Sequence, residues 1–225
     1  MTLRFAVIIP TLNEEASIER AIASAFEIDA SEVVVSDGGS SDQTLEIAAR
    51  SGATLMTSAR MRAQQMNEAA RSTAAEILVF LHADTTLPTG AGEMIRKAAE
   101  RGAAFGGFRI RFSEGGPRLR MAAAMINLRT SLTRCPWGDQ AQFVTRERFE
   151  TVRGFREIPI MEDYDFARRM KALGSVALLP GAVSTSGRRF LQRGVLATAA
   201  TNWRIILSYH LGVAPEELRR LYGSR

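Results

Sequence analysis

Cysteine is nearly absent from this chain, because only Cys135 among its 225 residues is a cysteine. An internal disulfide is therefore impossible, and the cytosol is the expected compartment. Cys135 precedes Pro136 and shows none of the surroundings that a nucleophile needs, so we interpret it as a structural residue. A signal peptide is not expected either, since the first residues lead directly into a strand-like run without a cleavage site.

Long hydrophobic runs are missing as well. No stretch approaches about 18 consecutive apolar residues, so we expect no transmembrane helix. Internal repeats, low-complexity segments and linkers are also absent. The composition, with 46% hydrophobic and 24% charged residues, is typical of a globular protein. These features indicate one domain over residues 1–225.

Negative charge is scarce in the second half. Residues 1–95 contain 6 Lys and Arg against 13 Asp and Glu, a balance of −7, whereas residues 96–225 contain 23 against 11, a balance of +12. This split predicts that the second half faces something anionic, such as substrate phosphates or lipid headgroups, with a solvated basic face as the alternative. The aromatic and basic pattern of an RNA-binding sheet is absent, so nucleic acid is not an expected partner.

Short apolar runs alternate with helical patterns in the first hundred residues. The strand-like runs are 5–10, 32–37, 52–57 and 78–82, and the helical patterns are 18–26, 43–50, 60–72 and 89–101. Polar residues follow the strands at their carboxyl ends, where open α/β sheets bind ligands. This order predicts an α/β fold with a mostly parallel central sheet and helices on both faces.

Acids follow two of these strands. Asp37 opens a loop with Gly38 and Gly39, but the G-x-G-x-x-G and phosphate-loop lysine patterns are missing. A carboxylate at this position favours a nucleotide held by its base and ribose. Asp84 is then a candidate to hold a metal that reaches the phosphates, with capping of a turn before Pro88 as the alternative.

The second half contains a strand pattern at 104–112, a helix from Pro117 and a further strand at 141–145. The large apolar residues of that helix share one side, which we interpret as a core face. These residues are Met121, Met125, Leu128 and Leu132. A membrane-surface or acceptor-lining role is the alternative. A long, largely apolar helix is expected at 192–211 and a short one after Pro215.

Six segments of the chain occur together in a fixed order. They are VIIPTLNEE at 7–15, VVVSDGGSSDQT at 33–44, LVFLHADT at 78–85, GDQ at 138–140, MEDYDFARR at 161–169 and SGRRF at 186–190. In this order the chain resembles the inverting, nucleotide-sugar-dependent glycosyltransferases of family 2, in particular a short, soluble bacterial subgroup. The resemblance implies a GT-A fold with a donor half at 1–115, an acceptor half at 116–190 and C-terminal helices at 191–225.

The resemblance also implies roles for single residues. The donor would contact Pro10, Thr11, Asn13, Glu14, Asp37, Gly38, Gly39, Arg60, His82, Ala83, Asp84, Arg188 and Arg189. Asp84 would hold a divalent cation, Mn²⁺ or Mg²⁺. Asp163 would be the general base, next to Glu162. The acceptor would lie against Trp137, Gly138, Asp139 and Gln140.

Two motifs depart from the family pattern. The D-x-D motif is His82-Ala83-Asp84 here, so its first acid is replaced by histidine. The arginine pair stands in place of the Q-x-x-R-W motif of processive synthases, without its tryptophan. These departures favour the transfer of a single sugar from a UDP- or GDP-sugar.

The acceptor is expected to be anionic or lipid-linked, with peripheral contact at the inner face of the membrane. One competing interpretation is a nucleotidyltransferase. Those enzymes usually carry a basic, glycine-rich loop after the first strand, whereas residues 11–15 here are acidic and contain no glycine. Another is a nucleotide-sugar-binding protein with a decayed active site, which only His82 favours.

Overall fold

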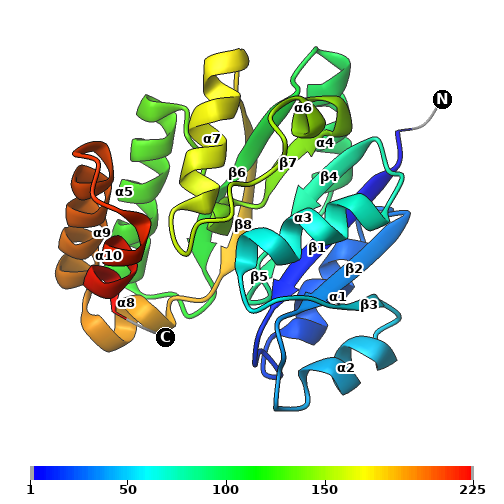
Figure 1. Ribbon diagram of the computed structural model, residues 1–225, viewed down its shortest axis with the longest axis horizontal. Coiled ribbons are helices and arrows are strands. Elements are labelled where there is room, and N and C mark those ends of the chain that lie inside the picture. The colour runs from blue at the N-terminus through cyan, green and yellow to red at the C-terminus, as the bar shows by residue number, and fades with distance from the viewer. Residues whose placement is uncertain (1–2, 224–225) are drawn as a thin grey trace.

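The computed structural model describes residues 3–223 as one mixed sheet of eight strands in the order β3-β2-β1-β4-β7-β6-β8-β5, with helices packed on it (Figure 1). The strands are β1 (Phe5–Thr11), β2 (Glu32–Asp37), β3 (Thr54–Thr57), β4 (Ile77–Phe80), β5 (Thr85–Thr86), β6 (Phe105–Phe112), β7 (Gln142–Thr145) and β8 (Ala177–Thr185). The helices are α1 (Ile18–Phe26), α2 (Thr44–Arg50), α3 (Arg62–Ser72), α4 (Ala91–Glu100), α5 (Pro117–Thr133), α6 (Arg146–Thr151), α7 (Glu162–Leu173), α8 (Arg188–Arg193), α9 (Val195–His210) and α10 (Pro215–Tyr222), with a short 3-10 turn at Gly138–Gln140. Residues 1–2 and 224–225 of the expected domain lie outside this description.

The first four long strands form the predicted parallel part of the sheet. β1 pairs in parallel with β2 and β4, and β2 pairs in parallel with β3. β1 is buried along its whole length because its alternate residues pack into opposite layers. Val7 and Ile9 face the layer of α1 and α4, whereas Ala6 and Ile8 face that of α3 and α7. Burial on both faces explains why the strand sequence is apolar throughout.

The second part of the sheet has a different pairing. β7 runs antiparallel to both β4 and β6, while β6 and β8 are parallel. The register places Gln142, the first residue of β7, opposite Phe80, the last residue of β4. The turn that precedes β7 therefore lies beside the carboxyl end of β4.

Aromatic side chains join this strand end to α7. The ring centroids of Phe80 and Phe155 are 4.8 Å apart, and those of Phe155 and Phe166 are 4.3 Å apart. All three rings are buried. This packing holds the start of α7 next to the carboxyl end of β4.

Several element boundaries differ from the sequence prediction, most of them by one or two residues, and three concern the candidate site or the C-terminal helices. The fourth strand ends at Phe80, so His82 lies in the loop that follows it, and the helix expected from residue 60 begins at Arg62. The helix expected at 192–211 is divided into α8 and α9. They meet at Gly194, whose φ of 82° is a conformation that glycine adopts at low cost.

α5 contradicts our expectation about its core face. The four residues expected to be buried are Met121, Met125, Leu128 and Leu132. All four are exposed, from 48% for Met125 to 76% for Leu132. Ala122 and Ala123, on the opposite side, pack against the sheet with Leu119. Small side chains let α5 approach β6 closely, so the larger ones remain on the outer side.

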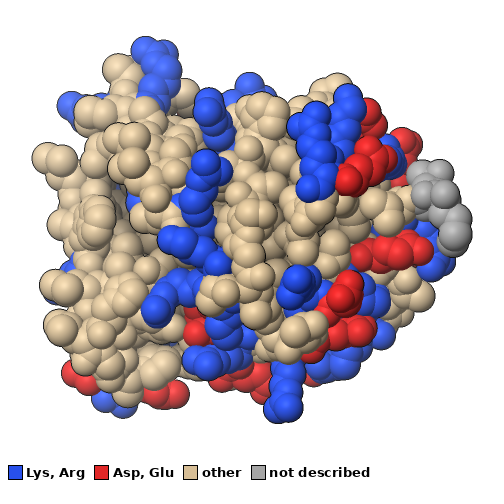
Figure 2. Space-filling view, turned by 90° about the horizontal axis from the view of Figure 1, so that it is seen from above, with Lys and Arg blue, Asp and Glu red and all other residues tan. Residues whose placement is uncertain are grey.

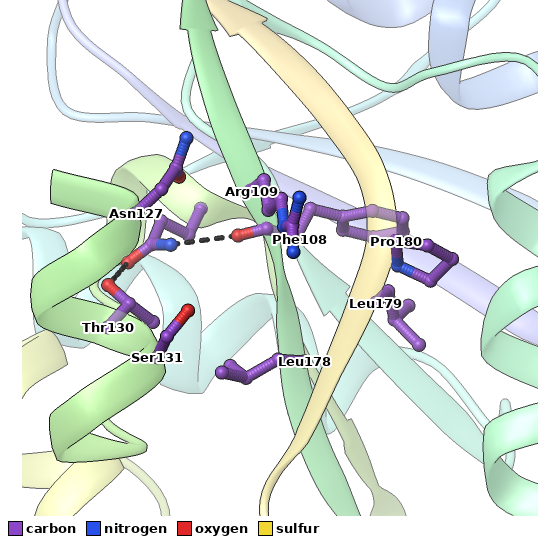
Figure 3. Close-up of a pocket in the computed structure, with 9 residues that line it drawn as sticks. Phe108, Arg109, Asn127, Thr130, Ser131, Leu178, Leu179 and Pro180 are labelled. Atoms are coloured by element: carbon purple, nitrogen blue, oxygen red, sulfur yellow. Dashed lines mark hydrogen bonds between the residues drawn. The ribbon is translucent and has the colours of Figure 1, made fainter. Parts of the chain in front are cut away.

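A small cavity lies between α5, β6 and β8 (Figure 3), and Gln140 of the turn before β7 is one of its lining residues. Its volume is about 140 Å³, below the range of roughly 300–1,000 Å³ that is usual for ligand pockets. Phe108, Asn127 and Leu178 are among its lining residues. Among the helices of residues 3–223, none is long and apolar enough to cross a membrane.

Candidate active site

The carboxyl ends of β1, β2 and β3 meet at one edge of the sheet, the lower edge in Figure 1. The register places Thr11 beside Asp37, and Asp37 beside Thr57. Gln65 of α3 donates hydrogen bonds to the carbonyl oxygens of Thr11 and Ser36, both at 2.9 Å. Gln65 thereby fixes the ends of β1 and β2, a role that our sequence analysis missed.

Asp37 organises the loop after β2. Its buried carboxylate accepts hydrogen bonds from the backbone N–H groups of Gly39 and Ser40, both at 2.8 Å. A Cβ added to Gly38 would lie 2.9 Å from Gln65 Nε2 and 3.4 Å from the Cα of Arg60. The structure therefore brings Asp37, Gly38 and Arg60 together.

The loop after β1 is joined to this second loop. Asn13, with a φ of 55°, donates from its N–H to Ser40 Oγ and accepts from the N–H of Ser41 at Oδ1, both at 2.8 Å. Glu14 Oε2 lies 3.1 Å from the guanidinium of Arg188, the first residue of α8. The donor half and the C-terminal helices thus meet at Glu14.

Arg188 also faces the end of β4. Its NH2 lies 3.7 Å from Asp84 Oδ2, and Thr85 Oγ1 is 3.4 Å from Asp84 Oδ1. The Asp84 side chain is 25% exposed, so its carboxylate can still be approached by a ligand. The second arginine, Arg189, has a different contact, because its Cζ lies 3.7 Å from the ring centroid of Tyr222.

The other predicted donor residues are buried beside these groups. Pro10 remains within β1, paired with Ser36, and Ala83 is 5% exposed between His82 and Asp84. Both contribute shape rather than polar side chains to the site.

The metal prediction depends on Asp84. Within residues 3–223, no three His, Cys, Asp or Glu side chains converge as a metal cage. Mg²⁺ is usually bound by one or two carboxylates together with substrate phosphates and water. A single accessible carboxylate in the loop after β4 fits a cation that arrives with a diphosphate.

Arg62 is a second residue that our sequence analysis missed. Its NH1 lies 3.1 Å from His82 Nε2, and its Nε lies 2.7 Å from Glu162 Oε1. A guanidinium can only donate hydrogen bonds, so His82 Nε2 is the acceptor. Burial raises the pKa of Glu162 against the opposing effect of Arg62, and the Glu162 carboxylate in turn raises the pKa of Arg62. The only sequence signal was a second arginine two residues after Arg60.

Asp163 lies against the turn before β7. Its Oδ2 accepts a hydrogen bond from the N–H of Gly138 at 2.7 Å, and its Oδ1 accepts one from the N–H of Tyr164 at 2.7 Å. A Cβ at Gly138 would lie 2.7 Å from His82 Nε2 and 2.9 Å from Asp163 Oδ2. Three motifs that are far apart in the sequence therefore meet at Gly138, where a side chain would collide with two of them.

The C-terminal helices support the start of α7. Met161, just before Glu162, has a φ of 69°, a conformation that costs a non-glycine residue about 1–3 kcal/mol and is common at functional sites. Met161 packs with Ile160, Ile205 of α9 and Leu218 of α10. These contacts hold the strained residue in place.

Asp165 lies in the first turn of α7, two residues after Asp163, and is buried. It pairs with Arg169, at 2.7 Å between Oδ2 and Nε. It also pairs with Arg156 at 3.2 Å and accepts a hydrogen bond from the hydroxyl of Tyr209 at 3.0 Å. Asp165 thus joins α7 to α9 and has a structural role.

Gln140 is buried and joins the 3-10 turn to its neighbours. Its Oε1 accepts hydrogen bonds from Thr130 Oγ1 at 2.8 Å and from the N–H of Trp137 at 3.0 Å, and its Nε2 donates to the carbonyl of Phe108 at 2.8 Å. Arg129 stacks on Trp137, with its Cζ 3.7 Å from the ring centroid. These contacts fix the shape of the turn.

Asp139, on the same turn, has an oxygen that forms no hydrogen bond, unlike the side chain of Gln140. Its Oδ1 is buried and has no hydrogen-bond partner within residues 3–223. Burial raises the pKa of Asp139 from 3.8 to about 6, with Arg129 opposing and the nearby carboxylates of Asp163 and Asp84 adding to the rise. A buried oxygen of this kind, facing other acids of the site, is suited to a hydrogen bond with a substrate hydroxyl.

Comparisons with known proteins place this arrangement in a family. The family model described as Glycosyl transferase family 2 matches residues 6–174, whereas no curated protein matches the chain. Residues 1–349 of S. aureus TarS, solved with UDP-GlcNAc, match with a TM-score of 0.64 and 18% identity, over 82% of this chain and 58% of that one. The mannosyltransferase PcManGT from Pyrobaculum calidifontis, solved with GDP-Man and Mn²⁺, matches with a TM-score of 0.64 and 24% identity, over 94% of this chain and 62% of that one. Glucosyl-3-phosphoglycerate synthase from Mycobacterium tuberculosis, solved with Mg²⁺ and UDP, matches with a TM-score of 0.59 and 17% identity, over 94% and 79%.

At these identities the similarity concerns the fold, which is the GT-A fold expected from the sequence. This chain spans less than two thirds of the TarS fragment and of PcManGT. The family match is broader evidence, because it covers well over half of the chain and five of the six motifs. The chain therefore belongs to glycosyltransferase family 2.

Proposed function

We propose that this enzyme transfers one sugar from a UDP- or GDP-sugar to an acceptor hydroxyl, with metal assistance and with inversion at the anomeric carbon. The observation that carries the proposal is the meeting of three motifs at Gly138, which lies between His82 and Asp163. A donor bound at the strand ends and an acceptor bound at the turn would thus be adjacent. The solved neighbours that bind UDP-GlcNAc and GDP-Man support the donor class.

Residues 1–115 form the donor half in this proposal. The loops that begin at Thr11 and Asp37 are fixed to each other and to Gln65, so they present a preformed surface for the base and ribose. Arg60 lies beside Gly38 at the rim of this surface. Preformed loops lower the ordering cost of binding a flexible nucleotide.

Arg188 and Arg62 both contact the segment His82–Asp84, where this proposal places the diphosphate. Arg188 contacts Glu14 and Asp84, and Arg62 contacts His82 and Glu162. When bound, a divalent cation at Asp84 would stabilise the negative charge that develops on the leaving diphosphate. The two arginines would add fixed positive charge at the same place.

Residues 116–190 supply the acceptor side in this proposal. Asp163 acts as general base, and its two backbone hydrogen bonds orient the carboxylate towards the turn. Asp139 Oδ1 receives a hydrogen bond from the acceptor, and Trp137, stacked on Arg129, provides an apolar surface. Gln140 keeps this turn in shape. Residues 191–225 brace Met161 and thereby the start of α7.

The experiment that tests this proposal is a panel of UDP- and GDP-sugars, measured for nucleotide release and sugar transfer with and without Mn²⁺. Asp84→Ala tests the metal site and Asp163→Asn tests the base. We expect Mn²⁺-dependent nucleotide release that each substitution lowers. If the folded wild type neither binds nor cleaves any donor of the panel, the proposal is wrong.

A further inference from the structure

The outer side of α5 is unusual for a helix at the surface. Its exposed residues Met121, Met125, Leu128 and Leu132 recur at the spacing of one helical face, opposite to Ala122 and Ala123 in the core. A surface helix normally presents polar residues to water, whereas this one is apolar on two opposite sides. Burial in the core explains only the inner side.

α9 repeats the same arrangement. Leu196, Trp203 and Leu207 are exposed by 78%, 61% and 62%, and Leu211 follows directly after the helix at 74%. They share one face, opposite to the buried residues Thr198 and Ile205. α9 packs beside α5 at one end of the molecule (Figure 1). We call the eight exposed residues of α5 and α9, Met121, Met125, Leu128, Leu132, Leu196, Trp203, Leu207 and Leu211, the outer face.

The helices of the outer face carry positive charge only, and the nearest acids in the sequence are Glu114 before α5 and Glu216 and Glu217 in α10. Residues 115–138 contain four arginines and no Asp or Glu, and residues 186–215 contain four arginines and again no Asp or Glu. Arg118 and Arg120 lie exposed in the first turn of α5. Figure 2 shows a largely uncharged surface at the end of the molecule that carries α5 and α9, with a row of Lys and Arg next to it.

We propose that the outer face binds the surface of a bilayer that contains anionic phospholipid. Amphipathic helices bind such surfaces by inserting apolar side chains at the headgroup level while their arginines contact lipid phosphates. Tryptophan, as at position 203, is a residue that favours this interface. A second copy of the chain fits less well, since pairing two outer faces would bring two sets of arginines together without any acid on these helices to balance them.

The consequence for the acceptor rests on the proposed function. α8, which precedes α9, begins at Arg188, and Arg188 contacts Glu14 and Asp84 of the active site. The membrane-binding helices are therefore connected directly to the donor site. Binding at the outer face would place the active site next to the bilayer, where an acceptor that is anchored in lipid is present at high local concentration.

Vesicle sedimentation tests the membrane proposal without any sugar donor. The vesicles consist of phosphatidylcholine alone or with phosphatidylglycerol, each at low and high salt. We expect binding to the vesicles with phosphatidylglycerol at low salt and weaker binding at high salt. The double variant Leu128→Glu/Leu207→Glu should bind about a hundredfold more weakly, because burial of each leucine contributes roughly tenfold in affinity.

The matched control is Leu55→Glu, a comparable change at a residue of β3 that is 40% exposed and lies outside the outer face. It should bind vesicles as the wild type does. Replacing Arg118 and Arg120 by Gln should lower affinity by about fivefold each, since a surface arginine contributes about 1 kcal/mol near an anionic bilayer. Quenching of tryptophan fluorescence by brominated lipid should be present in the wild type and reduced in Trp203→Phe.

Two results would overturn the membrane proposal. One is equal vesicle binding by the wild type and the folded Leu128→Glu/Leu207→Glu variant. The other is absent vesicle binding together with a dimer, seen by sedimentation velocity, that this variant dissociates, because a second copy would then cover the outer face. Titration with UDP and GDP is independent of both results, so a failure of the proposed donor site is distinguishable from a failure of this surface.

Discussion

Asp139 leads to a quantitative prediction about stability. Burial raises its pKa from 3.8 to about 6, so the folded protein binds this proton more tightly than the unfolded chain does. The free energy of unfolding therefore falls as the pH rises from about 4 to about 6, and the loss is complete above that range. Since one pKa unit corresponds to about 1.4 kcal/mol, the ionised Asp139 carboxylate lowers stability by about 3 kcal/mol at pH 8.

Asp139→Asn removes the charge and keeps the shape of the side chain. We expect this variant to be more stable than the wild type at pH 8, by up to about 3 kcal/mol, or roughly 6–12 °C in Tm. The difference should be small at pH 4, where Asp139 of the folded wild type is protonated. Urea and thermal unfolding at both pH values measure it. Asp29→Asn is the control, because Asp29 is exposed in a left-handed turn position that Asn tolerates.

The same substitution should lower sugar transfer. Loss of a hydrogen bond between an ionised group and the acceptor corresponds to about 1.5–3 kcal/mol, or roughly 10–150-fold. A gain in stability together with a loss of activity would be the signature of a strained functional residue. If Asp139→Asn is less stable than the wild type at pH 8, the attraction of Arg129 outweighs burial, and our account of this residue is wrong.

Three further predictions concern the other acids and Arg62. Asp163→Asn should lower transfer by roughly 10²–10⁴-fold with unchanged nucleotide affinity, and full activity would exclude Asp163 as the base. Asp84→Ala should abolish the effect of Mn²⁺ on nucleotide binding in calorimetry, and an unchanged Mn²⁺ effect would place the cation elsewhere. Arg62→Met should cost about 3–5 kcal/mol in urea unfolding at pH 8 by leaving the buried carboxylate of Glu162 unpaired, whereas Arg62→Met/Glu162→Gln should recover most of it. A double variant as unstable as Arg62→Met would contradict the ion-pair explanation.

The parallel half of the fold could be predicted because its signal is local. Strands buried on both faces must be apolar throughout, so β1, β2 and β4 were identified to within two residues. The face of α5 could not be predicted in the same way. Periodicity shows that Met121 and Leu128 share a side, but two opposite sides of this helix are apolar, and only the close approach of α5 to β6 selects the smaller residues for the core.

The predicted site residues have side chains whose chemistry a sequence motif can indicate. The roles of the missed residues, Gln65 and Arg62, depend on contacts that form only in the folded chain. Asp37, Asp84 and Asp163 are predicted from the sequence because each lies in one of the six motifs that carry the family resemblance. Gln65 and Arg62 are ordinary polar residues of a helix in the sequence. Their roles arise only when α3 packs against the strand ends, where Gln65 reaches two backbone carbonyls and Arg62 reaches Glu162. The sequence pattern alone does not show that α3 packs against the strand ends.

The contacts of Arg62 also give a physical reason for histidine at position 82. Arg62 is the cation paired with buried Glu162, and its second contact is His82 Nε2, which accepts a hydrogen bond without adding a negative charge. An aspartate at this position would make two carboxylates share one guanidinium. It would also add a further negative charge to a region that already holds Asp84 and Asp163, where like charges oppose ionisation. Histidine therefore keeps the contact between the donor side and α7 while preserving the charge balance of the Arg62–Glu162 pair, so its presence here is compatible with a working active site.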